Sequence, residues 1–230
     1  MANITQLKHL EHLEDEMLNY GVRGCHAAVD FLRELRKMVG RKPTGSMMQT
    51  KWDGAPSVVC GKHPYTGRFF VGTKSVFNIT EPKLCYFDDD VDTYYQGDLA
   101  NKLKASLEHF KKLDIGGVIQ GDLLYTDDVS QENINGQNLY TFRPNTITYA
   151  IPVDHPLGEQ CKSSKIGVVF HTHYTGDDLG SMQAHGGVPD SMIGSHSDVL
   201  NIKNTTAVQD VNFSAAEFNE FDRHVDEIER

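Results

Sequence analysis

The sequence has few cysteines, and they form no recognisable pair. Its four cysteines lie far apart and show no Cys-x-x-Cys spacing, which argues against both a zinc site and a disulfide framework. No run of apolar residues is long enough to cross a bilayer, and residues 1–16 carry charges throughout. We therefore expect a protein of the reducing cytoplasm that makes no membrane contact.

Basic residues are also in short supply. The chain has 22 Lys and Arg residues against 32 Asp and Glu residues, so its formal net charge is −10. Such a charge repels a phosphate backbone unless the basic residues gather on one face. Strong general binding to nucleic acid by this chain alone is therefore not expected.

The length and the apolar pattern predict one main core with helical additions. A chain of 230 residues with 39% hydrophobic residues can bury one sizeable core. Apolar residues recur at helical spacing on both sides of Gly21, and Ser214 and Glu217 form a capping-box pattern. We predict an N-terminal helical pair in residues 1–42, a core in residues 43–204 and a C-terminal helix in residues 205–230.

Within the core the pattern favours β structure. Two short apolar runs flank a loop with Pro and Gly and predict a hairpin, and a buried strand is expected after a helix. Residues 175–204 are rich in Gly, Ser, His and Asp without a clear period, so we expect a loop there with at most one short helix. The predicted elements are hairpin strands at 58–60 and 68–71, a helix at 99–113, and strands at 117–125, 146–151 and 166–170.

The tetrapeptide Lys51-Trp52-Asp53-Gly54 carries the clearest chemistry. A lysine attacks the α-phosphorus of ATP only as the free amine, and a partly desolvated site beside Mg²⁺ and phosphate assists the loss of its proton. Asp53 stands two residues on, on the same face of an extended chain, where it could contact the ribose; Gly54 permits a tight turn beside the nucleotide. The alternative is a surface turn in which Asp-Gly closes a hairpin.

The segment Gln49-Thr50-Lys51-Trp52-Asp53-Gly54 resembles motif I of the covalent nucleotidyltransferases, the superfamily of ATP-dependent DNA and RNA ligases and mRNA capping enzymes. The resemblance implies an α+β nucleotidyltransferase fold, the ATP-grasp-like ligase adenylation fold, with antiparallel sheets and an added N-terminal helical pair. It implies ATP and Mg²⁺ as cofactors, Lys51 as the nucleophile, and Gln49, Thr50 and Gly54 at the nucleotide. Gln49 replaces the Glu that is usual at its position.

Two further segments extend this resemblance. Phe70-Val71-Gly72-Thr73-Lys74-Ser75 follows the hairpin where the superfamily has motif Ia, which implies that Lys74 contacts sugar or phosphate. As an alternative, Lys74 is a solvated residue at a strand end. Ile119-Gln120-Gly121-Asp122 is similar to motif III, with Asp in place of the usual Glu.

Asp122 is informative beyond the resemblance. A carboxylate at the end of a buried strand is unfavourable unless it is paired or bound to a metal. Asp122 is therefore a candidate to hold Mg²⁺ through water or to fix a ribose hydroxyl. The alternative is a residue that caps nearby amides where the strand ends.

The later motifs of the superfamily are incomplete. The strand 166–170 is similar to motif IIIa and implies that Phe170 stacks on the adenine, although a single Phe in an apolar strand is also typical of a core. The sequence has no recognisable motif IV, and Ile202-Lys203-Asn204 has one lysine where motif V has Lys-x-Lys. The resemblance thus covers about residues 46–172.

Two other groups have the composition of metal sites. The acidic run at residues 88–92 lacks the spacing and glycine of an EF-hand loop and is typical of a solvated loop. His171 and His173 alternate along a strand, which predicts that both imidazoles share one face. A third ligand at recognisable spacing is missing from the sequence.

The sequence therefore predicts an ATP-dependent nucleotidyltransferase of polynucleotide-ligase type that forms lysyl-AMP on Lys51, with Asp53 and Asp122 as further catalytic residues. Nucleic-acid ends are the expected partners of a true ligase. The alternatives are a ligase-like module that has lost turnover and binds a nucleotide or a protein partner, and an enzyme that modifies proteins or small molecules with AMP. The opening residues with Lys51-Trp52-Asp53-Gly54-Ala55-Pro56 also resemble proteins of large tailed phages without an established activity, which implies a host-cytoplasmic setting.

Overall fold

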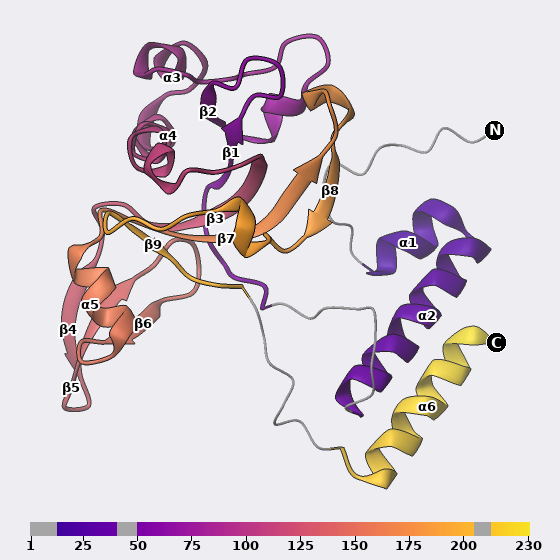
Figure 1. Ribbon diagram of the computed structural model, residues 1–230. Coiled ribbons are helices and arrows are strands. Elements are labelled where there is room, and N and C mark those ends of the chain that lie inside the picture. Colours follow the sequence, from indigo (N-terminus) through magenta and orange to yellow (C-terminus); the bar gives the residue numbers. More distant parts are fainter. Residues whose placement is uncertain (1–12, 41–49, 205–212) are drawn as a thin grey trace. The chain divides into compact units, whose positions relative to one another are not determined.

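The computed structural model describes residues 13–40, 50–204 and 213–230 (Figure 1). The described chain forms two compact units. One unit holds Lys51–Asn204, and the other holds the described residues of His9–Thr50 and Thr205–Arg230. Both helices and sheets are present and the strand pairs are mostly antiparallel, so the α+β class with antiparallel sheets is confirmed.

The larger unit is organised around a mostly antiparallel sheet. Its strands run in the order β2-β1-β3-β7-β8, and β9 adds a parallel pair beside the start of β7. The central pair β3 and β7 is buried along most of its length because neighbouring strands flank both. The strands are β1 Ser57–Lys62, β2 Phe69–Gly72, β3 Val118–Tyr125, β7 Ile166–Thr175, β8 Gln183–Gly186 and β9 Val199–Asn201.

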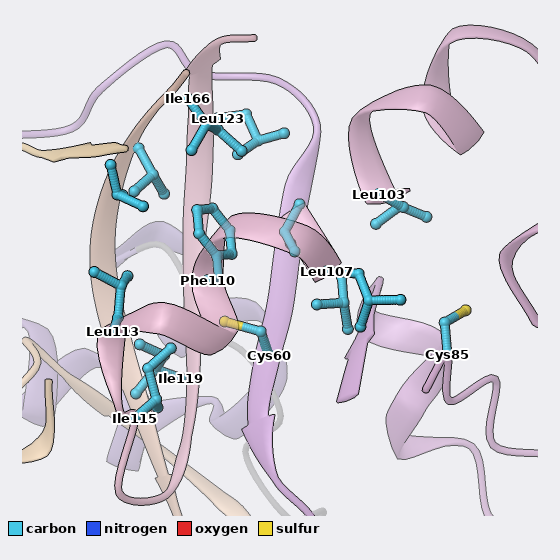
Figure 2. Packing of buried hydrophobic residues seen from close by; sticks show 14 of the residues in the cluster. Cys60, Cys85, Leu103, Leu107, Phe110, Leu113, Ile115, Ile119, Leu123 and Ile166 are labelled. Atoms are coloured by element: carbon cyan, nitrogen blue, oxygen red, sulfur yellow. The ribbon is translucent and has the colours of Figure 1, made fainter. Parts of the chain in front are cut away.

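One face of this sheet is covered by α4, Gly97–Phe110, which continues into the 3₁₀ turn η2, Lys111–Leu113. Apolar residues of the helix and of the strands form the main core cluster, shown in Figure 2. The helix predicted at 99–113 and the buried strand predicted at 117–125 are both present. Residues at the centre of this cluster include Leu103, Leu107, Phe110, Ile119, Leu123 and Ile166.

The acidic run at 88–92 is part of helix α3, Asp88–Tyr94, and the prediction of a loop there is wrong. Three aspartates stand in its first turn, where negative charge is favoured by the exposed N–H groups of the helix. The carboxylate of Asp90 accepts hydrogen bonds from the backbone N–H groups of Tyr86 and Phe87. These interactions explain why the acidic run forms a helix, although its composition is typical of a solvated loop.

A second, three-stranded sheet contains β4 Ser130–Ile134, β5 Gln137–Phe142 and β6 Tyr149–Pro152, and α5, Pro156–Ser163, follows it. A turn with positive φ at Asn135 and Gly136 joins β4 to β5, as an Asn-Gly hairpin requires. Residues of this sheet pack with the ends of β3 and β7 in a separate apolar cluster. The β5–β6 loop leaves this sheet at residues 143–148.

Residues 175–204 contain more regular structure than the sequence predicts. They hold β8, β9 and two 3₁₀ turns, η3 Leu179–Ser181 and η4 Asp190–Met192. Both strands are short and pair with β7, which the sequence predicts only as far as Phe170. Because the ladder of β7 supplies the pairing, strands form here without a local apolar period.

The helical unit contains α1 Leu13–Tyr20, α2 Val22–Val39 and α6 Ala215–Glu229. The break at Gly21 and the capping box at Ser214 stand as predicted. Arg36 of α2 joins α6 by an ion pair with Asp222, with Nη2 2.7 Å from Oδ2, and lies over the ring of Phe218. The structure thus places the C-terminal helix in one unit with the N-terminal pair.

Candidate functional site

The loop of residues 51–54, called the Lys51 loop below, lies against Asp122 of strand β3, although the two are distant in the sequence. A Cβ atom on Gly54 would lie 2.5 Å from the Cβ of Asp122 and 2.8 Å from the carbonyl oxygen of Leu123. Two backbone hydrogen bonds fix this contact, from Ala55 N–H to Leu123 O at 2.9 Å and from Leu123 N–H to Pro56 O at 3.1 Å. The glycine of the tetrapeptide is therefore required for close approach.

Asp53 is anchored by the β5–β6 loop. Its Oδ2 accepts hydrogen bonds from the backbone N–H of Thr146 at 2.8 Å, the hydroxyl of Thr146 at 2.7 Å and the backbone N–H of Ile147 at 3.0 Å. Its Oδ1 accepts one from Asn145 Nδ2 at 2.8 Å. These bonds, led by those from Thr146, lower the pKa of Asp53 to about 2. Asp53 is thus ionised and holds the loop in place, and only Oδ1 keeps an acceptor site for a ribose hydroxyl.

Aromatic packing supports the same anchor. The ring of Trp52 lies 5.1 Å from that of Tyr149, which in turn stacks on Phe142 at 5.8 Å. The backbone N–H of Asp53 donates a hydrogen bond to the hydroxyl of Tyr149 at 2.8 Å. The indole N–H of Trp52 is buried, and among the described residues it has no hydrogen-bond partner. The loop is therefore fixed on both sides of Asp53.

Lys51 itself is exposed. Within the described parts of the chain, no ion pair or hydrogen bond engages its amine. The nucleophile proposed from the sequence is thus available for reaction while the residues after it are fixed.

Asp122 faces the loop from β3 and lies beside a histidine of β7. It stands opposite Ser57 in the β1–β3 register. His171 Nε2 lies 3.4 Å from Asp122 Oδ1, and both side chains are about one-fifth exposed, at 23% and 21%. The carboxylate is therefore close to solvent and also close to an imidazole.

A buried chain of polar side chains lies next to this pair. Gln120 Nε2 donates to Ser57 Oγ at 2.8 Å, and the hydroxyl of Tyr174 donates to Gln120 Oε1. Burial raises the pKa of Tyr174, so its hydroxyl remains a donor at neutral pH. This chain links β1, β3 and β7.

Three residues that the resemblance places at the nucleotide, Gln49, Thr50 and Lys74, lie in different parts of the chain. Gln49 lies outside the described residues, and Thr50 is exposed at the start of a described segment. Lys74 is exposed in the 3₁₀ turn η1, Lys74–Phe77, and does not end a strand. Within the described chain, no hydrogen bond or ion pair joins Lys74 to residues 51–54.

The position of Phe170 contradicts the prediction that its ring stacks on an adenine. Its ring is 4% exposed and packs edge-on against Phe110 of α4, with centroids 5.2 Å apart. It belongs to the main core cluster between the sheet and α4. A ring enclosed in this way has no free face for a base, so the core alternative holds.

His171 and His173 do not form the pair that alternation predicts. His173 Nδ1 lies 2.7 Å from the carbonyl oxygen of Gly187, and its ring stacks on His185 at 5.1 Å, whereas His171 contacts Asp122. A register shift in β3–β7 separates the two imidazoles. In the part of the chain that the structure describes, no group of three or more His, Cys, Asp or Glu residues has the arrangement of a metal site.

Sequence reasoning missed the partners that hold the site together. Thr146 and Ile147 belong to the strand predicted at 146–151, whereas β6 begins only at Tyr149 and both residues lie in the β5–β6 loop. The sequence predicts a role for His171 only through its spacing to His173. Their roles depend on contacts between segments distant in the sequence, which no local pattern encodes.

The fold and the site define a class: an α+β protein in which a loop with an exposed lysine packs against a buried strand that carries an aspartate. The chain belongs to a protein family of unknown function (DUF6267), whose model matches residues 3–230. No curated protein and no solved structure matches the chain. None of the helices in the described ranges combines the length and the apolar character needed to cross a bilayer.

Proposed function

We propose that this protein is an ATP-dependent nucleotidyltransferase of polynucleotide-ligase type, which forms a lysyl-AMP intermediate on Lys51. The observation that carries the proposal is the contact of Gly54 with Asp122. This contact joins the two segments on which the resemblance to covalent nucleotidyltransferases depends. This contact supports a common site, because it brings the segment that follows Lys51 next to Asp122.

In the proposed reaction, the free amine of Lys51 attacks the α-phosphorus of ATP. A bond forms between Nζ and phosphorus, the bond from the α-phosphorus to the bridging oxygen breaks, and pyrophosphate leaves with that oxygen. The amine loses a proton to solvent. Lysine suits this role because its amine, unlike a guanidinium, can be deprotonated.

The contribution of Asp53 is positional. A loop that is fixed before the substrate arrives lowers the entropic cost of orienting the nucleophile. The hydrogen bonds of Asp53 to Asn145, Thr146 and Ile147, with the packing of Trp52 on Tyr149, supply this order. The remaining acceptor site on Oδ1 suits a ribose hydroxyl.

Asp122 suits Mg²⁺ only as a partial ligand. Mg²⁺ prefers oxygen ligands and is commonly held by one or two carboxylates together with substrate phosphates and water. The partly exposed carboxylate of Asp122, on β3 beside the loop, agrees with this mode. The ion would supply charge neutralisation on the triphosphate.

One observation favours the alternative of a ligase-like module without turnover. Lys203, the single lysine near a motif V position, forms an exposed ion pair with Asp190, with distances of 3.0 and 3.1 Å from Nζ to the two carboxylate oxygens. In this state the Lys203 amine is not free to contact a triphosphate. Labelling of the protein by ATP separates the two candidate functions.

The test is transfer of label from ATP to protein in the presence of Mg²⁺. The proposal predicts stable label from α-labelled ATP and none from γ-labelled ATP, and loss of the α-label in Lys51→Ala and Lys51→Arg. Lys111→Ala is the matched control, because Lys111 is also an exposed lysine. Absence of α-label in the folded wild-type chain would favour the binding module.

A further inference from the structure

The position of His171 depends on an irregularity in the β3–β7 ladder. Gln120 pairs with Thr172, whereas the next residue, Gly121, pairs with Phe170. His171 is therefore the extra residue of a β-bulge. Bulges redirect side chains and are common beside active sites.

The bulge changes which side chains face the Lys51 loop. In a regular strand Phe170 and Thr172 would share a face, yet here they pair with adjacent residues of β3, whose side chains alternate. Phe170 enters the core under α4. His171 comes to lie beside Asp122.

The surroundings of the imidazole determine how it can bond. Nδ1 lies 2.8 Å from the hydroxyl oxygen of Thr172, a residue that is 3% exposed. Nε2 is buried and makes no hydrogen bond among the described residues, and the Oδ1 of Asp122 lies 3.4 Å from it. A carboxylate only accepts, so a neutral His171 presents Nε2–H to Asp122 while Nδ1 accepts from Thr172.

Asp122 has little other support. Its backbone is fixed where Gly54 packs against it and where Gly121 packs on Val169 and Phe170. Within the described chain, His171 supplies the polar contact that its carboxylate makes. This contact involves Oδ1 and leaves Oδ2 for another partner.

We propose that His171 is a positioning residue of the Lys51 site, which holds Asp122 Oδ1 so that Oδ2 is presented to the bound nucleotide or its metal ion. The role rests on the proposed nucleotidyltransferase function. The 3.4 Å contact shortens to a hydrogen bond when substrate draws the carboxylate into place, as such contacts do in other enzymes.

The first arm of the test measures the rate of Lys51 adenylylation at saturating ATP. Loss of a residue that orients a metal-binding carboxylate commonly costs about 10-fold to 100-fold, and we expect this fall for His171→Ala. His171→Gln should recover part of the rate, because its amide N–H₂ reaches about as far as Nε2. His171→Asn reaches only to the Nδ1 position and should not. His173→Ala, two residues along the same strand, is the matched control and should keep the wild-type rate.

A double variant shows whether His171 acts through Asp122. Asp122→Asn with His171→Ala should be no slower than Asp122→Asn alone, because the partner of His171 is already altered. Rates that fall by the product of the two single effects would overturn the proposal. So would equal rates for His171→Gln and His171→Asn, or a comparable loss in His173→Ala.

The second arm needs no activity, so it distinguishes failure of this inference from failure of the proposed function. Nitrogen NMR of the histidine rings in the free protein should show His171 as the Nε2–H tautomer. Its ring signals should shift in Asp122→Asn, while those of His173 should not. If wild type fails to form lysyl-AMP yet His171 responds in this way, the contact stands and the enzymatic assignment falls. A His171 ring that is insensitive to Asp122→Asn would refute the contact itself.

Discussion

The carboxylate of Asp53 accepts hydrogen bonds from both the backbone N–H and the hydroxyl of Thr146, at 2.8 and 2.7 Å. Through these bonds the loop after Lys51 is attached to the β5–β6 loop of the second sheet. The attachment makes the geometry of the candidate site depend on residues that lie far along the chain.

The first prediction concerns pH and Asp53. Its pKa is lowered from 3.8 to about 2 in the folded protein, so its contribution to stability is complete above pH 3.8 and is lost as the pH falls toward 2. Unfolding of wild type and Asp53→Asn should therefore differ most near neutrality and converge in acid. Denaturant titrations at several pH values would test this. A difference that stays constant down to about pH 2 would contradict the anchoring role.

A second prediction uses the close contact of Gly54. A methyl group there would overlap Asp122 and Leu123, so Gly54→Ala should destabilise the protein by about 1–3 kcal/mol and abolish labelling. Gly116→Ala is the matched control, since its added Cβ meets nothing closer than 3.8 Å. Equal stability of the two variants would show that the loop moves away from β3 at little cost.

A third prediction concerns the buried polar chain. Tyr174→Phe removes the donor to Gln120 Oε1 and leaves a buried acceptor unpaired, which should cost about 1–3 kcal/mol. Tyr65→Phe is the control, because Tyr65 is 73% exposed. The midpoint of chemical denaturation should fall only for Tyr174→Phe. A similar midpoint for both variants would remove this chain from the account of stability.

The fourth prediction concerns Asp122. Asp122→Asn keeps the size of the side chain but removes its charge, so adenylylation should fall by about 100-fold or more, while folding is retained. Asp114→Asn changes an exposed carboxylate that pairs with Lys62, and it should leave the labelling rate unchanged. A wild-type rate in Asp122→Asn would assign Asp122 to structure alone.

Much of the fold follows from local pattern, and much of the site does not. The hairpin, α4, β3 and α6 were predictable because apolar spacing, Pro and Gly, and a capping box are local. Strands β8 and β9 were not, because their pairing is imposed by β7.

Some residues of the candidate site could likewise be predicted from the sequence, and others could not. The Lys51 loop and Asp122 were recognisable from their motifs, and the structure brings them together. The prediction that His171 and His173 share a face was wrong because alternation in the sequence does not reveal the bulge at His171. Phe170 lies in the core with Ile166 and Val168, as regular alternation along β7 places it. The hydrogen bonds to the Asp53 carboxylate were not predicted, because their donors, residues 145–147, belong to a loop far from Asp53 in the sequence.

The most direct test of the central claim is peptide mass spectrometry of the full-length protein after incubation with ATP and Mg²⁺. The account predicts that the peptide containing Lys51 gains the mass of one AMP, that fragmentation places the AMP on the lysine, and that excess pyrophosphate reverses the modification. An unmodified Lys51 peptide, or AMP on another residue that persists in Lys51→Ala, would contradict it.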